Sequence, residues 1–172
     1  SALANNTTGN ENVAVGFAAL NGMTTGDRNT AVGKSAMASN STGSNSTAIG
    51  NIALNQCLAD ENIGVGYAAG KSITTGVRNI AIGNEALDDC DTEADNIAIG
   101  YGAMTTNNAG GEKNIVIGNY AGDAITSAGL SVLVGYDAGS ALSSGNKITA
   151  IGGSAGTGIV GNQNTMCLGY NA

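Results

Sequence analysis

A four-residue pattern recurs through the whole chain: two β-forming residues flank a small residue, and a glycine follows. Its ten copies end at Gly16, Gly33, Gly50, Gly66, Gly83, Gly100, Gly118, Gly135, Gly152 and Gly169. Such a nearly constant period is typical of a solenoid, in which each repeat forms one coil stacked on the last. Short β-branched segments and frequent glycine favour strands and turns over helices. We therefore predict an all-β fold: a parallel β-solenoid, or β-roll, of ten 17-residue coils that forms one repeat domain over residues 1–172.

The residue directly before each closing glycine is a branched aliphatic in all ten repeats. We predict that this column faces the core, and it comprises Val15, Val32, Ile49, Val65, Ile82, Ile99, Ile117, Val134, Ile151 and Leu168. The residue two positions earlier points the same way in a strand, while the intervening residue, mostly alanine, points the opposite way. Both faces of the strand are thus apolar, and such strands are usually covered on both faces. We expect one face to line the coil and the other to pack against another copy of the chain.

Two columns after the closing glycine indicate tight packing. The third residue after it is alanine in all ten repeats, from Ala19 to Ala172, which predicts a close approach by another part of the coil. The next residue is either large or glycine, and each glycine is accompanied three residues later by isoleucine or leucine. We predict that these two positions share one pocket, because densely packed interiors require such compensation. The pairs are Gly70 with Ile73, Gly122 with Ile125, Gly139 with Leu142, and Gly156 with Ile159.

Polar residues also form columns. Asparagine stands four residues before the closing glycine in six repeats, which predicts a ladder of hydrogen bonds from coil to coil. The column one residue earlier holds four of the six basic residues of the chain together with several acidic ones. We expect Arg28 to neighbour Glu11, and Arg78 to lie between Glu61 and Asp95, with each opposite-charge contact contributing ~0.2–1 kcal/mol.

Composition argues against several functions. Histidine, the most common acid–base side chain and metal ligand, is absent. A net charge of −7 with six basic residues argues against nucleic-acid binding. No apolar run approaches the ~20 residues that span a bilayer, and no secretory signal pattern opens the chain, so we expect no membrane insertion. The chain begins at Ser1 and stops at Ala172 in the middle of a repeat, which we interpret as a fragment of a longer fibre protein.

Tyrosine follows the closing glycine in every second repeat over the C-terminal part of the chain, at Tyr67, Tyr101, Tyr136 and Tyr170. Strands in a sheet lie ~4.8 Å apart, so these rings would recur roughly every 9.6 Å. One interpretation is a row of rings that stacks on the sugars of a cell-surface polysaccharide, which makes these four residues the candidate glycan-binding site. The competing interpretation is that the rings fill gaps between coils or between chains.

The stretch DDCDTEADN places five carboxylates between Asp88 and Asp95. Its spacing matches neither an EF-hand nor calcium-binding β-roll repeats, so we expect a solvated loop. A glycosidase needs two carboxylates held across a cleft, which one loop does not supply.

The three cysteines, Cys57, Cys90 and Cys167, fit no zinc-site spacing, and we expect them to be small buried side chains. We expect no disulfide between Cys57 and Cys90, because two coils separate that pair. We therefore expect no enzyme activity, catalytic residue, metal site or cofactor.

The repeats TTGNENVAVGFAAL, TTGDRNTAVGKSAM and TTGVRNIAIGNEAL resemble those of bacteriophage tail fibres and related fibre proteins, and this resemblance extends over the whole chain. Such repeats often precede an endosialidase-type intramolecular chaperone. The segment NIAIG is also similar to the head repeat of trimeric autotransporter adhesins, whose head is a left-handed β-roll wound as a trimer. The present chain has a longer coil than that head, and it shows no coiled-coil stalk or membrane anchor. The resemblance implies a left-handed, homotrimeric solenoid.

These features predict a structural and adhesive function: the shaft or head of a trimeric phage tail fibre that takes part in attachment to the host cell surface. The implied partners are further copies of the chain, other fibre or virion proteins, and a host glycan or protein receptor; the implied location is the virion. One alternative is a bacterial trimeric autotransporter adhesin head at the cell surface. Two others are a polysaccharide-cleaving tail spike and an ice-binding β-solenoid, whose threonine array would be interrupted at Ala59 and Asp60.

Overall fold

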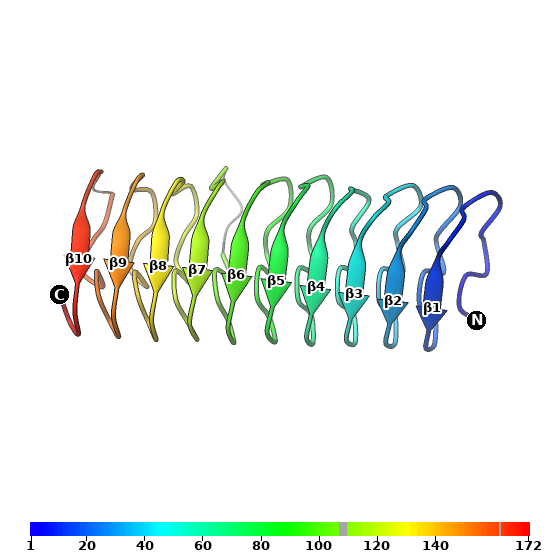
Figure 1. The fold of residues 1–172 in the computed structure, drawn as a ribbon, viewed down its shortest axis with the longest axis horizontal. Helices are drawn as coiled ribbons and strands as arrows, with labels where there is room; N and C mark the ends of the chain where they lie inside the picture. The colour runs from blue at the N-terminus through cyan, green and yellow to red at the C-terminus, as the bar shows by residue number, and fades with distance from the viewer. Residues whose placement is uncertain (107–109, 162) are drawn as a thin grey trace.

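The computed structural model describes residues 1–106, 110–161 and 163–172, in which ten short strands form one parallel sheet in chain order (Figure 1). The predicted all-β parallel β-solenoid is therefore confirmed. The described part of the chain contains no helix able to span a bilayer. The strands are β1 (Val13–Val15), β2 (Thr30–Val32), β3 (Thr47–Ile49), β4 (Ile63–Val65), β5 (Ile80–Ile82), β6 (Ile97–Ile99), β7 (Ile115–Ile117), β8 (Val132–Val134), β9 (Thr149–Ile151) and β10 (Met166–Leu168).

The strands pair at the same repeat positions throughout the sheet. Ala81 lies opposite Ala98, the equivalent residue of the next repeat. The repeat that separates Thr47 from its partner Ile63 is slightly shorter than the others, and the repeat between β6 and β7 is slightly longer, yet both keep equivalent residues opposite one another. The shorter and longer repeats thus preserve the register, because their length differences fall outside the strands.

The strands face the opposite way from the sequence-based prediction. The middle residue of a strand is buried, as in Ala81, whereas the residue before the closing glycine lies outside, as in Val15 with 57% of its surface exposed. The prediction that this column lines the core is therefore wrong, and the column forms part of an outer sheet face. Its members are Val15, Val32, Ile49, Val65, Ile82, Ile99, Ile117, Val134, Ile151 and Leu168, all half-buried or exposed.

A narrow interior explains this orientation. The segment that returns from one strand to the next carries the alanine column, which is fully buried from Ala19 to Ala155, and only small side chains fit between it and most strands. The middle residues of β7 and β8 are larger, Val116 and Leu133, and there the returning segment has glycine. A Cβ atom at Gly122 would lie 3.0 Å from Leu133 Cδ1 and 3.3 Å from Val116 Cγ1. In the other strands, the interior has room for a middle residue little larger than alanine.

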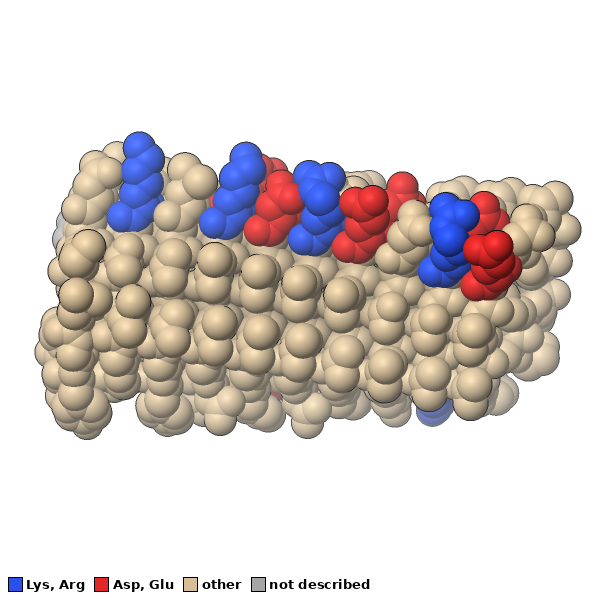
Figure 2. Space-filling view, viewed as in Figure 1, with Lys and Arg blue, Asp and Glu red and all other residues tan. Residues whose placement is uncertain are grey.

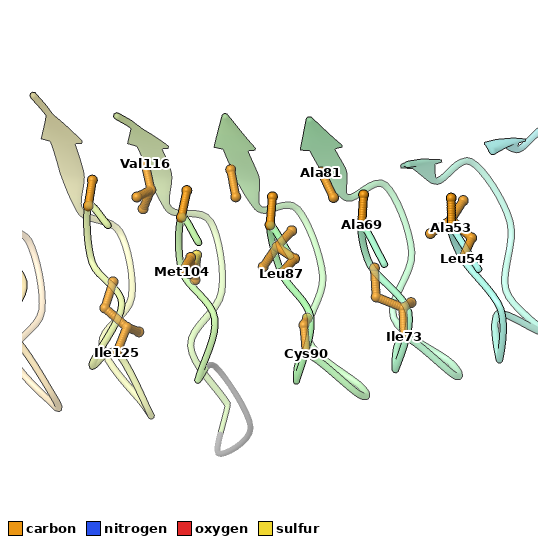
Figure 3. Packing of buried hydrophobic residues seen from close by; sticks show 14 of the residues in the cluster. Ala53, Leu54, Ala69, Ile73, Ala81, Leu87, Cys90, Met104, Val116 and Ile125 are labelled. Atoms are coloured by element: carbon orange, nitrogen blue, oxygen red, sulfur yellow. The ribbon is translucent and has the colours of Figure 1, made fainter. Parts of the chain in front are cut away.

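Large side chains of the returning segment fill the rest of the core, as Figure 3 shows for Leu54, Leu87 and Met104. The predicted pocket sharing is confirmed at Gly70, where a Cβ atom would lie 2.9 Å from Ile73 Cδ1. The same relation holds for Gly122 with Ile125 and for Gly156 with Ile159. At Gly139 the three atoms nearest to an added Cβ atom all belong to Leu133, so the glycine makes room there for the large middle residue of β8.

The asparagine column is largely buried and forms the predicted ladder. The main-chain N–H of Asn96 donates to Asn79 Oδ1 at 3.0 Å, and Asn79 Nδ2 donates to the Glu93 carbonyl at 2.7 Å. Ser46 and Ser131 continue the ladder through their hydroxyl oxygens, which accept main-chain N–H groups at 3.0 and 3.2 Å. Each asparagine thus satisfies buried backbone groups of the adjacent coil, which would otherwise lack partners.

Every coil turns at positions with positive φ. The closing glycine Gly66 has a φ of 135°, and a Cβ atom there would lie 2.5 Å from the carbonyl oxygen of Gly83 in the next coil. Non-glycine residues adopt the left-handed region at three further repeat positions, as in Arg78 (56°), Glu85 (59°) and Leu87 (51°). Because this conformation costs an L-residue roughly 1–2 kcal/mol, the stacking of coils imposes these turns against local preference.

Candidate interaction surface

The outer sheet face carries two columns of apolar side chains along the whole solenoid. They are the first and third residues of each strand, and seventeen of the twenty are Val, Ile, Leu or Met. Away from the ends, 38% of Ile63, 37% of Ile82 and 38% of Ile115 remain exposed. Together these columns expose on the order of 1,000 Å² of apolar surface, whereas monomeric proteins rarely show contiguous apolar patches above a few hundred Å². This face is the candidate functional site.

A row of charged residues borders the outer sheet face on the side where the strands begin. Figure 2 shows this charged edge, which consists of the residues five positions before each closing glycine. Arg78 forms the expected pair with Asp95 of the next coil, at 2.6 Å from Nε to Oδ1, and this contact lowers the pKa of the Asp95 carboxyl. Arg28 donates from Nε to Asn45 Oδ1 at 2.7 Å, and it makes no ion pair with Glu11 among the described residues.

The other border of the outer sheet face, which we call the aromatic edge, consists of the residue directly after each closing glycine. Tyr67, Tyr101, Tyr136 and Tyr170 occupy this edge, and all four are exposed. Phe17 stands at the same position in the first repeat and is 71% exposed. The predicted tyrosine row therefore exists as a row of accessible rings.

A fifth tyrosine, which the repeat pattern did not single out, connects two members of this row. The ring of Tyr120 lies 5.3 Å from that of Tyr101 and 6.1 Å from that of Tyr136, both in edge-to-face geometry. Gly102 makes room for it, since a Cβ atom there would lie 3.3 Å from Tyr120 Cδ1. No enclosed pocket occurs around these rings or elsewhere in the described residues, so they form an open surface.

The acidic stretch is only partly the solvated loop that the sequence predicted. Glu93 is buried, and its carboxylate accepts main-chain hydrogen bonds from Asp91 and Thr92 at 3.1 Å and from Gly110 at 2.9 Å. The residue stands where several other coils have glycine, and its side chain holds two coils together from inside the turn. Within residues 1–106, 110–161 and 163–172, no cluster of three or more Cys, Asp or Glu side chains is arranged to hold a metal ion.

A second acidic residue of the stretch is also engaged. Asp88 Oδ1 lies 3.0 Å from Lys71 Nζ of the preceding coil. Partial burial raises the pKa of the Asp88 carboxyl despite this pairing, while the hydrogen bond with Asp88 raises the pKa of Lys71. Both groups thus serve coil-to-coil contacts.

All three cysteines are free, which confirms the prediction that Cys57 and Cys90 are not joined. Cys57 and Cys90 are buried, whereas Cys167, in the middle of β10, is only half-buried. Burial raises the pKa of the Cys57 thiol, and burial together with the neighbouring Glu93 carboxylate raises that of Cys90. These two thiols are therefore unreactive core side chains.

One of the two threonine columns considered for ice binding is engaged within the fold. Thr24 Oγ1 donates to the Ser41 carbonyl at 2.9 Å, and Thr7 Oγ1 donates to the Thr24 carbonyl at 2.8 Å. Thr126 makes the equivalent bond to Ser143 at 3.1 Å. These hydroxyl groups extend the coil-to-coil hydrogen bonding, whereas Thr8, Thr25 and Thr42 of the neighbouring column are exposed on three successive coils.

Comparison of the chain with protein-family models, with curated proteins and with solved structures found no match.

Proposed function

We propose that this chain is a structural segment of a fibre, namely the shaft or head of a homotrimeric, left-handed β-solenoid of the phage tail-fibre type. The observation that carries the proposal is the outer sheet face, whose two columns extend from β1 to β10 and are apolar except at Thr30, Thr47 and Thr149. The apolar surface that this face exposes, on the order of 1,000 Å², is comparable with the ~800 Å² per partner that stable protein interfaces bury. A second copy of the chain is the partner that matches this face in length along its whole extent.

Solenoid architecture supports a fibre role. Each coil contacts only its neighbours, so length increases with coil number without a change in the contacts that stabilise each coil. The outer sheet face repeats with the same period, and self-association therefore adds a similar, largely apolar contact at each coil. An elongated oligomer of this kind would hold an attachment site away from a particle surface.

Attachment to a host glycan or protein receptor, at the virion or alternatively at a bacterial cell surface, is the activity that we assign to the complete fibre. The exposed tyrosine row favours a contribution from this segment to glycan binding. The test is to measure binding of host polysaccharide before and after the substitutions Tyr136→Ala and Tyr170→Ala. Loss of binding would support that contribution, and undiminished binding would exclude it.

The test of self-association is sedimentation equilibrium of the 172-residue chain. We expect a species of three times the 16.7 kDa monomer mass. The substitutions Ile82→Glu and Ile99→Glu, which place charge on the outer sheet face, should release monomers. Ser39→Glu and Thr75→Glu, at exposed positions of the returning segments, provide the matched control and should leave the oligomer intact. A wild-type chain that sediments as a folded monomer at micromolar concentration contradicts the proposal.

A further inference from the structure

Aromatic and basic residues correspond to each other across the outer sheet face. Four residues of the aromatic edge are followed, in the next coil, by a basic residue at the charged edge. These pairs are Phe17 with Arg28, Tyr67 with Arg78, Tyr101 with Lys113, and Tyr136 with Lys147. The other five positions that have a following coil are not aromatic, and the charged-edge residues that follow them are not basic: Lys34 with Asn45, Asn51 with Glu61, Asn84 with Asp95, Asn119 with Leu130, and Gly153 with Asn164.

Contacts within one chain do not account for this correspondence. The two edges are separated by the strand, about six residues or roughly 20 Å of extended chain. The basic groups that have partners use them within the charged edge, Arg28 with Asn45 and Arg78 with Asp95. The rings and the basic side chains are all exposed.

We propose that the charged edge of one copy lies against the aromatic edge of a neighbouring copy, offset by one coil, so that each of the four basic residues stacks on a ring. This inference rests on the self-association proposed above and specifies its geometry: the copies run parallel, and unlike edges meet. A cation over an aromatic face is an attractive contact. Arg78 can make it while it is paired, because a guanidinium bonded to a carboxylate at its edge keeps a planar face free for stacking.

The one-coil offset follows from the residues and from the slope of the strands. Without an offset, Glu61 and Asp95 would lie against Tyr67 and Tyr101, which places carboxylates on the negative faces of rings. Figure 1 shows each strand inclined toward the C-terminal end of the solenoid as it runs from the charged edge to the aromatic edge. Each ring therefore lies closer to the level of the following coil. Copies related by a rotation about the fibre axis stand at the same height, so this displacement brings the ring toward the charged edge of the following coil in the neighbouring copy.

Two other arrangements fit less well. An offset in the opposite direction would leave Tyr67 facing Asn45, and Arg28 facing Asn51. An antiparallel arrangement reverses the order of coils in one copy, so the coil-by-coil correspondence is lost along most of the length.

The test is disulfide cross-linking of three double variants that share Tyr67→Cys, each in a Cys167→Ala background. The second substitution is Arg78→Cys for the proposed offset, Glu61→Cys for no offset, or Asn45→Cys for the opposite offset. All three second positions are exposed and have φ between 56° and 61°, so the variants are matched in backbone strain. The two edges of one chain are too far apart for a disulfide, which needs Cα atoms within ~6.8 Å, and every cross-link therefore joins two copies.

We expect the Arg78→Cys variant to form covalent oligomers several-fold faster than the other two under mild oxidation, on gels run without reductant. Thermal melting with reductant present checks that the three variants are equally folded. Fastest cross-linking by the Glu61→Cys or Asn45→Cys variant, or equal rates for all three, overturns the inference. Sedimentation of the reduced variants separates the two proposals: an oligomer with the wrong cross-link refutes only the edge pairing, whereas a folded monomer refutes self-association as well.

Discussion

At the scale of single residues, the closing glycine is the position that the coil can least replace. At Gly66 the backbone has a φ of 135°, and a Cβ atom would lie 2.5 Å from the Gly83 carbonyl oxygen and 2.6 Å from its carbonyl carbon. Both obstacles are backbone atoms of the next coil, so neither can move aside cheaply. The glycine is therefore required twice, by its own conformation and by its neighbour.

We predict that Gly66→Ala lowers the free energy of unfolding by roughly 3 kcal/mol or more, because backbone strain and steric overlap act together. Urea unfolding followed by circular dichroism measures the change. Gly158→Ala is the matched control, since an added Cβ atom at Gly158 meets no atom within 4 Å and its φ is not in the left-handed region. Similar losses in the two variants would contradict this account of the closing glycine.

The cysteines permit a pH test at the same scale. Because the pKa values of the Cys57 and Cys90 thiols are raised in the folded state, both stay protonated at a pH where a free thiol, with a pKa of about 8.5, ionises. Their contribution to stability is fully present below that pH and declines as the pH rises toward the folded-state values. Only the thiolate is alkylated at an appreciable rate.

We therefore expect iodoacetamide to modify Cys167 in the native protein, while Cys57 and Cys90 stay unmodified at pH 8 and also when the pH is raised to about 8.5, where a free thiol is half ionised. Mass spectrometry of tryptic peptides measures each site, and modification in urea at pH 8 is the control, in which all three should react. Alkylation of Cys90 in the native protein as fast as in urea would show that its burial is not maintained.

At the scale of structural elements, the asparagine ladder connects the coils where the strands are too short to do so alone. Three-residue strands supply few main-chain bonds, and the asparagine side chain adds two bonds to the next coil, one accepted from a main-chain N–H and one donated to a carbonyl. Asn79 accepts from the Asn96 N–H and donates to the Glu93 carbonyl, and it is fully buried. Its removal leaves both backbone groups without a partner in the interior.

We predict that Asn79→Ala lowers the free energy of unfolding by about 2–4 kcal/mol, since two buried backbone groups lose their partners. Asn84→Ala is the control from the next turn: Asn84 is exposed, although its Oδ1 accepts the Tyr67 N–H at 3.1 Å, and its loss should cost less than about 1 kcal/mol. Chemical denaturation of both variants decides the question, and equal effects would mean that the ladder is not a structural requirement.

At the scale of the whole molecule, the outer sheet face makes stability depend on concentration. If copies associate through this face, the folded oligomer is favoured by mass action, and its melting temperature rises with protein concentration. We expect an increase of roughly 2–4 °C for each tenfold increase in concentration. Differential scanning calorimetry over a hundredfold range measures it, and the Ile82→Glu, Ile99→Glu variant should lose the dependence. A wild-type melting temperature that is the same at all concentrations would contradict association.

The repeat by itself determined the strands, their register and the position of each turn. Identical chemistry in every repeat can be satisfied only when equivalent residues stack, and this requirement does not depend on any distant contact. The alanine column, three of the four shared pockets and the asparagine ladder were predictable for the same reason, since each involves residues in the same or adjacent coils.

Only the tertiary structure decided which face of the strand points inward. Alternation along a strand separates Ile80 and Ile82 from Ala81, but it does not say which set is inside, because the answer depends on the width of the enclosed space. That width is set by the returning segment, whose buried alanines lie close behind the sheet and leave room for Ala81 but not for isoleucine. The same packing buries Glu93 within a turn and turns the aliphatic columns outward, which is why the surface that defines this protein is visible only in the folded chain.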